Sequence, residues 1–343
     1  MKIAILRGPR DLHLEEHNLD TSNLKPDELW IETEISAFKI GTDRGNYEGA
    51  EYTPGVAMYP RSVGDSNLGI IHGLGSAVTR FQIGDRVVTR QHHQSEYITN
   101  QGASIVKVPA DVHSEDAVYA HLYGLSAHCY QKGQFRAGEY VAVIGLGVLG
   151  LGAVALGPLF GGRVVALGNS STRMEMADRM GAHASLSSDD PNLKEKLDAF
   201  TDGNGIDLVI LAANPWPALK TALDVVRPNG RIANVSLLGR GEPPLGGNPL
   251  PTELFYFKGL SLIAVSGPAG YMFPNESDQR DLDIERFSAD RACSHMLSLM
   301  ADGLLEPKRL ITHRFNYTEL VKAYEMAYHR EKSMLGVIFK WKE

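Results

Sequence analysis

The stretch YVAVIGLGVLG at residues 140–150 decides the fold, because it runs from an apolar strand pattern into a glycine-rich turn. Its last six residues form the pattern G-x-G-x-x-G. The apolar residues 148–159 that follow predict a helix, and residues 163–167 predict a second strand. A strand, this pattern, a helix and another strand, all within about thirty residues, are typical of a dinucleotide-binding βαβ unit.

Each glycine of the pattern has its own predicted role. Gly145 allows the tight turn, Gly147 lets the backbone approach a pyrophosphate, and Gly150 lets helix and strand pack closely. Val148 and Leu149 open the helix, whose free N–H groups and partial positive charge favour phosphate. The alternative is a glycine-rich turn without a ligand, because a chain with 35 glycines produces chance matches to the pattern.

The end of the second strand is expected to contact the adenosine ribose. An NAD site places Asp or Glu there, to accept hydrogen bonds from the ribose hydroxyls. This chain has Gly168, Asn169 and Ser170 instead, and Arg173 follows. No carboxylate would repel a 2′-phosphate and Arg173 can bind one, so the segment favours NADP(H). The alternative is that Arg173 is only a solvated helix residue.

The pattern of elements changes twice along the chain. Before residue 125, short strands such as 29–35 and 69–75 with turn signals between them predict a small β-barrel-like domain. Strands and helices then alternate to about residue 266, which predicts a parallel, doubly wound sheet. The remainder predicts two helices, near 290–302 and 318–329, and a closing strand at 335–340.

The composition bounds the class of protein. A chain of 343 residues that is 43% hydrophobic can bury a core, and its length favours two domains. A net charge of -7 argues against a nucleic-acid or anionic-membrane partner. No apolar run reaches the ~20 residues of a membrane span, and the N-terminus lacks a signal-peptide pattern, so we expect a cytoplasmic protein. Two distant cysteines, Cys129 and Cys293, exclude a disulfide framework.

Several short motifs outside this region point to one family. They include Ile40-Gly41-Thr42-Asp43, Gly84-Asp85-Arg86-Val87 and the segment LITHRF at 310–315. With the dinucleotide pattern, they make the chain resemble the medium-chain dehydrogenase/reductase superfamily, over nearly its whole length. The resemblance implies an α/β fold, in which a GroES-like β-barrel catalytic domain (1–123 and 268–343) holds an inserted Rossmann domain (124–267).

The resemblance also implies further contacts and an assembly. Residues that end strands of the Rossmann sheet are expected to contact the cofactor; these are Ala213, Ser236, Val265 and Ser266. Relatives pair these sheets edge to edge, so a homodimer is expected. The other expected partner is a small-molecule substrate.

The chain departs from this family at the zinc ligands. The position of the ligand cysteine holds Ile40, and the positions of the following His and Glu hold Asp65 and Ser66. The third ligand would fall near Leu122 or Tyr123. Since these residues do not form a zinc ligand set, we expect no metal and a zinc-independent branch of the alcohol dehydrogenase-like family. A substitute site made from Asp65 and three histidines, His92, His93 and His121, is the alternative.

Without zinc, protein groups must stabilise the charge that develops on the substrate oxygen. Thr42 occupies the place of a proton-relay hydroxyl in relatives, and Lys39 lies near it in sequence. Asp65 and His93 come from stretches that face the substrate in relatives. Three of them have a structural alternative: Lys39 as a solvent-facing lysine, Asp65 as a turn aspartate, and His93 as a structural or surface histidine. We therefore predict Lys39, Thr42, Asp65 and His93 as a catalytic group.

Together these patterns predict an NADPH-dependent oxidoreductase. It would transfer hydride between nicotinamide and a carbonyl or alcohol of a small molecule without zinc. One alternative is reduction of a conjugated C=C bond, as in the zinc-free quinone and enoyl reductases of this superfamily. A second, from another class, is a non-catalytic NADPH-binding protein.

Overall fold

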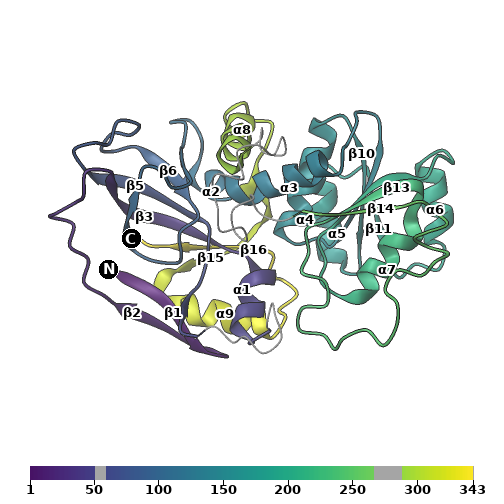
Figure 1. The fold of residues 1–343 in the computed structure, drawn as a ribbon, viewed down its shortest axis with the longest axis horizontal. Coiled ribbons are helices and arrows are strands. Elements are labelled where there is room, and N and C mark those ends of the chain that lie inside the picture. The colour runs from purple at the N-terminus through teal and green to yellow at the C-terminus, as the bar shows by residue number, and fades with distance from the viewer. Residues whose placement is uncertain (51–58, 266–287, 343) are drawn as a thin grey trace. The chain divides into compact units, whose positions relative to one another are not determined.

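The computed structural model describes residues 1–50, 59–265 and 288–342. The chain divides into two compact units, which we call the terminal unit and the inserted unit. The terminal unit comprises Met1–Gly124 and Ser288–Glu343, and the inserted unit comprises Leu125–Phe287. The chain first passes from one to the other within helix α3 (Ala120–Lys132) (Figure 1).

The inserted unit is built on a six-stranded sheet, in which every neighbouring pair runs parallel. The spatial order of its strands is β11 (Ala184–Ser187), β10 (Arg163–Gly168), β9 (Tyr140–Ile144), β12 (Ile206–Leu211), β13 (Val226–Asn234) and β14 (Ser261–Ala264). Its other helices are α4 (Val148–Leu159), α5 (Ser171–Arg179), α6 (Leu193–Phe200) and α7 (Trp216–Val225). This arrangement confirms the predicted doubly wound parallel sheet.

The central strands show why this segment folds as a parallel sheet. β9, β10 and β12 are almost continuous runs of Val, Ile, Leu and Ala, and nearly all of these side chains are buried. Such runs are typical of strands that are covered on both faces. Helix α4 lies close to β10, because a Cβ on Gly157 would come within 2.2 Å of Val164. Only glycine permits that approach.

The terminal unit is mainly antiparallel. Its larger sheet has the order β15 (Ile311–Asn316), β16 (Gly336–Lys340), β3 (Glu28–Phe38), β5 (Asn67–Leu74), β6 (Arg86–Thr89) and β8 (Ile105–Lys107), and β7 (Glu96–Asn100) also pairs with β3. The smaller sheet has the order β2 (Asp11–Glu16), β1 (Lys2–Gly8) and β4 (Arg61–Ser62). The two units together confirm the predicted fold class.

Two segments from opposite ends of the chain pack together in the terminal unit. Helix α1 (Ile40–Tyr47) contacts helix α9 (Leu320–Tyr328), and Figure 1 shows them side by side. The ring of Tyr324 lies 5.4 Å from that of Tyr47 and 4.6 Å from that of Phe38. This aromatic packing covers α1 just after β3 ends, and so buries the carboxyl of Asp43 on the same helix.

The other helices are short or follow the prediction closely. They are α2 (Ser114–Ala117), α8 (Ala289–Ala301) and two 3₁₀ turns, η2 (Pro307–Leu310) and η3 (Tyr317–Glu319). His121 and Tyr123 both lie inside α3. Across the three described ranges, no helix is long and apolar enough to cross a bilayer.

Candidate functional site

The glycine-rich turn of the inserted unit connects β9 to α4. Gly145 has φ +97°, in the left-handed region that favours glycine, and a Cβ there would lie 2.7 Å from the backbone nitrogen of Ala213. A Cβ on Gly150 would lie 1.8 Å from the carbonyl oxygen of Gly145. The turn therefore folds back on its own helix, and these two positions exclude any side chain.

Gly147 differs from these two glycines. It is the N-cap of α4, and the nearest atom to an added Cβ would be Nη1 of Arg173, at 4.0 Å. The space beside Gly147 is therefore open. Val148 and Leu149, which follow, belong to the first turn of α4, where backbone N–H groups have no intrahelical partner. Open space beside exposed N–H groups at a helix N-terminus fits the pyrophosphate of a dinucleotide.

The end of β10 places four of the predicted cofactor residues beside this turn. Gly168 ends the strand, Asn169 is exposed, and Ser170 is the N-cap of α5. From α5, Nη1 of Arg173 donates a hydrogen bond of 3.1 Å to the carbonyl of Leu146. The guanidinium therefore lies against the glycine-rich turn and is not a freely solvated arginine.

Two asparagines hold the next loop, and the sequence analysis did not single out Asn234. Asn234 ends β13 and its Oδ1 accepts a 2.6 Å hydrogen bond from the Ser236 hydroxyl. Oδ1 of Asn214 accepts a 3.1 Å hydrogen bond from the backbone N–H of Leu237. Both asparagines follow or end apolar strands, and this position is the signal that could have identified Asn234.

The remaining predicted cofactor residues also lie at strand ends. Ala213 contacts the glycine-rich turn, and Val265 is buried directly after β14, where its N–H donates to the carbonyl of Asn234 at 2.8 Å. Ser266 lies outside the described residues.

In the terminal unit, Lys39 and Asp65 form an ion pair. Lys39 directly follows β3, and Asp65 lies in the turn between β4 and β5. Nζ of Lys39 donates to Oδ2 of Asp65, and the two side chains are only 17% and 27% exposed. Burial acts to raise the pKa of Asp65, but the nearby positive charges, chiefly the ammonium of Lys39, together outweigh it and hold that pKa below its usual range. Asp65 is thus a carboxylate with a resident cation.

The carboxyl of Asp43 holds the backbone segments that carry this ion pair. Its Oδ2 accepts the backbone N–H of Lys39 at 2.9 Å, and its Oδ1 accepts that of Gly64 at 3.3 Å. One carboxyl therefore fixes the backbone on both sides of the ion pair. Burial, together with the charge of Asp65, raises the pKa of Asp43 to about 7.

His93 lies in the aromatic core of the terminal unit. It is 0% exposed, and its ring lies 5.0 Å from that of Phe339 in an edge-on arrangement. Nδ1 lies 2.8 Å from the hydroxyl of Ser36, which itself accepts from Nε1 of Trp341 at 2.9 Å. Burial lowers the pKa of His93 to about 3, so the imidazole is neutral near pH 7. We therefore assign His93 to packing, and not to proton donation as an imidazolium.

Gly64 explains why His93 lies so close to the ion pair. Gly64 has φ +86°, and a Cβ at this position would lie 2.7 Å from the His93 ring. The neighbouring His92 has its Nδ1 2.7 Å from the carbonyl of Gly64. A carbonyl only accepts, so this nitrogen carries the proton. Both histidines thus contact the backbone turn that presents Asp65.

The other predicted residues take different positions. Thr42 is half-buried in the first turn of α1, three residues after Lys39. His121 lies within range of the charge of Asp65, and burial lowers its pKa to about 4. Its Nε2 is buried without a hydrogen-bond partner among the described residues, as is Oδ1 of Asp65. Unpartnered buried polar atoms are rare, and these two indicate space for water or for a ligand's hydroxyl groups.

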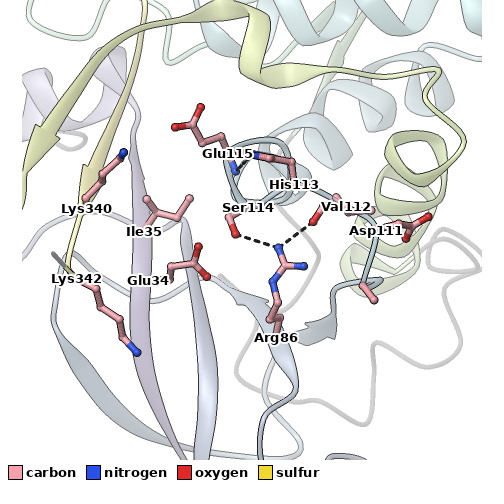
Figure 2. A pocket seen from close by; sticks show the side chains of 11 residues that line it. Glu34, Ile35, Arg86, Asp111, Val112, His113, Ser114, Glu115, Lys340 and Lys342 are labelled. Atoms are coloured by element: carbon pink, nitrogen blue, oxygen red, sulfur yellow. Dashed lines mark hydrogen bonds between the residues drawn. The ribbon is translucent and has the colours of Figure 1, made fainter.

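The terminal unit also has a hollow that lies away from the ion pair of Lys39 and Asp65 and is not the candidate site. It has a volume of about 600 Å³ and includes Ile35 and Lys340, which pair in the β3–β16 register. Lys39 is four residues further along the chain, about 13 Å at the rise of a strand. Figure 2 shows that Arg86 in this hollow bonds to Val112 and Ser114, and that the ammonium groups of Lys340 and Lys342 point apart. Its charged groups therefore do not converge on a ligand.

Comparison with known proteins finds similarity to dehydrogenases. The family described as Zinc-binding dehydrogenase matches residues 148–280. The sorbitol dehydrogenase of Halalkalibacterium halodurans is 25% identical, over 83% of this chain and 84% of that protein. The NADP-dependent isopropanol dehydrogenase of Thermoanaerobacter brockii is also 25% identical, over 80% and 82%. The alcohol dehydrogenase TADH from Thermus sp. ATN1 superimposes with a TM-score of 0.78 and 20% identity, over 99% of both chains.

The chain is thus similar to dehydrogenases, and the matched family model starts in helix α4 of the inserted unit. Its inserted unit is the part that fits a nicotinamide dinucleotide, since the glycine-rich turn and the helix N-terminus lie there.

The residues of this chain do not fit a zinc ion at the positions where the resemblance places ligands. Ile40 has no donor atom, Asp65 already pairs with Lys39, and the buried Ser66 hydroxyl donates to the carbonyl of Val118 at 2.8 Å. Within the described parts of the chain, no group of three or more His, Cys, Asp or Glu side chains is arranged to hold a metal. An ammonium group therefore lies where relatives of the zinc-dependent type would need a ligand.

Proposed function

We propose that this chain is an NADP(H)-dependent oxidoreductase that transfers hydride between nicotinamide and a carbonyl or alcohol carbon of a small molecule without a catalytic zinc ion. The ion pair between Lys39 and Asp65 carries this proposal, because it supplies a positive charge at the ligand position of a metal. Relatives named sorbitol dehydrogenase and isopropanol dehydrogenase support alcohol and carbonyl chemistry.

In the proposed mechanism, Lys39 acts on the substrate oxygen. During reduction, negative charge builds on that oxygen, and the ammonium stabilises it through a hydrogen bond and then donates the proton. Asp65 keeps the ammonium charged and holds it in place, and its unpartnered Oδ1 can accept from a second substrate hydroxyl. The nicotinamide supplies or takes up the hydride. In the oxidative direction Lys39 must start as the neutral amine that proton donation leaves, and it then receives the hydroxyl proton and becomes the ammonium again.

The preference for the phosphorylated cofactor is proposed from the end of β10. Gly168, Asn169 and Ser170 provide no carboxylate that would repel a 2′-phosphate. The guanidinium of Arg173 lies beside the glycine-rich turn and can form charge-assisted hydrogen bonds to a phosphate.

We also propose a homodimer that forms through β14. This strand is the edge of the parallel sheet, and Leu262 on it is 36% exposed. Tyr256 and Phe257 lie just before it in the chain and are 74% and 76% exposed. A strand edge that pairs with no further described strand, beside exposed aromatic side chains, is a surface that a second copy can cover.

A panel of reactions tests the proposed activity. Purified protein is given NADPH with ketones, hydroxyketones and conjugated enones, and NADP⁺ with alcohols and polyols, while metal content is measured in the same samples. Turnover of carbonyls or alcohols by protein with far less than one zinc per chain is expected. Turnover of enones alone would favour C=C reduction, and nucleotide binding with no turnover would favour a non-catalytic role. Stoichiometric zinc that is required for turnover would refute the zinc-free mechanism.

A further inference from the structure

A third charged side chain lies beside the ion pair. In the pairing of β5 with β6, Asn67 lies opposite Thr89. The strands are antiparallel, so the residue before Asn67, which is Ser66, and the residue after Thr89, which is Arg90, lie at the same end of the sheet. Asp65, one residue before Ser66, lies at this end as well. Arg90 is exposed at the point where β6 ends.

The positive charge of Arg90 reaches two of the site's groups. For Asp65, it adds to the stronger effect of Lys39, and together they outweigh the burial that would raise the pKa of this carboxyl. Burial is the main cause of the low pKa of His121, and Arg90 lowers that pKa further. Arg90 therefore lies within electrostatic range of Asp65 and His121, each of which has a buried atom without a described hydrogen-bond partner.

None of the described carboxylates around this point forms an ion pair with Arg90. The ammonium of Lys39 is matched by Asp65, while His93 and His121 are neutral near pH 7. Asp290, a carboxylate within range of His121, accepts a hydrogen bond from the Ser104 hydroxyl.

Arg90 has no hydrogen bond or ion pair with any described residue, in contrast to most arginines of the terminal unit. Arg86 donates to the carbonyl of Val112, Arg314 pairs with Glu115, and Arg10 pairs with Glu325. Those three arginines stabilise the fold. Among the described residues nothing occupies the guanidinium of Arg90, and its planar shape matches the two oxygens of an oxyanion.

Resting on the proposed function, we propose that Arg90 determines the substrate class: it binds an oxyanion of the substrate, a carboxylate or a phosphate, next to the hydroxyl or carbonyl group that Lys39 and Asp65 hold. The substrates are thus hydroxy acids or phosphorylated alcohols, and their carbonyl counterparts. Arg90 is a binding residue and takes no part in proton or hydride transfer.

Direct anion binding tests this proposal without requiring turnover. Protein saturated with NADP⁺, which fills the nucleotide's own phosphate site, is titrated with malonate and separately with inorganic phosphate in a calorimeter. The wild type is expected to bind at least one anion, and Arg90→Met should weaken that binding about tenfold or more. Arg80→Met is the matched control, because Arg80 is exposed in the same unit and its described hydrogen bond goes to the carbonyl of Gln101. Equal anion binding by wild type and Arg90→Met would overturn the proposal.

Kinetics with matched pairs tests the same proposal independently. The pairs are a hydroxy acid with its methyl ester, and a polyol with its phosphate ester. Arg90→Met should lower kcat/KM about tenfold for the charged member, mainly through KM, and change the neutral member less than about twofold. Equal losses for both members would indicate a structural role and refute the proposal. If no substrate is turned over, the proposed function fails, while the anion titration still decides the role of Arg90.

Discussion

Lys39 and Asp65 lie 26 positions apart in the chain, yet the ammonium of one donates directly to the carboxylate of the other. One backbone N–H on each side, from Lys39 and from Gly64, donates to the same buried carboxyl of Asp43. The pair is therefore held by a third residue that anchors both of its segments. This arrangement makes separate roles for the three side chains testable.

The first prediction concerns the ion pair. Lys39→Met should lower kcat about 100-fold or more, because it removes both the stabilising charge and the proton donor. Asp65→Asn should have a smaller effect on kcat, since it only frees the ammonium. NADPH affinity, measured by fluorescence titration, should stay unchanged in both variants. Lys340→Met, in the hollow that is about 13 Å away along the strand, is the matched control. Full activity of the Lys39→Met variant would exclude the proposed mechanism.

The second prediction concerns Asp43 and pH. Its pKa is about 7 in the folded protein and 3.8 without the fold. Between about pH 4 and 7 the folded state keeps a proton that the unfolded chain releases, so this carboxyl stabilises the fold at low pH. That contribution is lost as the pH rises through about 7.

Asp43→Asn removes this titration. Relative to wild type, the free energy of unfolding of the variant should rise by on the order of 1–3 kcal/mol from about pH 5 to pH 8. Urea unfolding at a series of pH values measures the difference. The exposed Asp111→Asn provides the control. A constant offset between wild type and Asp43→Asn across this range would show that Asp43 does not titrate there.

The third prediction separates two glycines of the nucleotide turn. Gly150→Ala places a Cβ 1.8 Å from a backbone oxygen, so it should lower the Tm of the apo protein by roughly 5 °C or more. Gly147→Ala meets only open space and should leave the apo Tm unchanged. It should still weaken NADPH binding, because the methyl group occupies the approach to the pyrophosphate. Equal NADPH affinity for Gly147→Ala and wild type would argue against a nucleotide at this turn.

The fourth prediction concerns the choice of cofactor. Arg173→Met should weaken NADPH binding about tenfold and leave NADH binding nearly unchanged, since only NADPH has the 2′-phosphate. Because this side chain also donates to the carbonyl of Leu146, the apo Tm is measured as a control for loop stability. A parallel loss of affinity for both nucleotides would mean that Arg173 supports the turn and does not select the cofactor.

The fifth prediction concerns the edge strand. Leu262→Arg places a charge on β14 and should convert the proposed dimer to a monomer, as measured by light scattering after gel filtration. Leu304→Arg is the matched control, because Leu304 is 57% exposed in the terminal unit. A wild-type protein that is monomeric at micromolar concentration would refute the dimer.

The local pattern of the sequence was enough to predict the nucleotide-binding turn of the inserted unit and the strand and helix beside it. Helix α4 begins and ends at the predicted residues, and β9 does as well. Both are long apolar runs next to glycines, so their periodicity and their ends are encoded locally. Strand β11 and helix α6 were not predicted. The strand ASLS is short and polar, so its residues show no distinctive pattern.

The candidate catalytic group shows where sequence reasoning stopped. The residue types at positions 39, 42, 65 and 93 predicted a polar cluster in place of a metal site, and the absence of a cysteine at position 40 needed no structure. Only the tertiary structure separated their roles, because pairing depends on contacts between segments that are distant in the chain. It brought the ammonium of Lys39 to Asp65 and enclosed His93 among aromatic rings, which makes that imidazole neutral. The burial and neighbours of a side chain decide its charge, and neither is encoded in the residue alone.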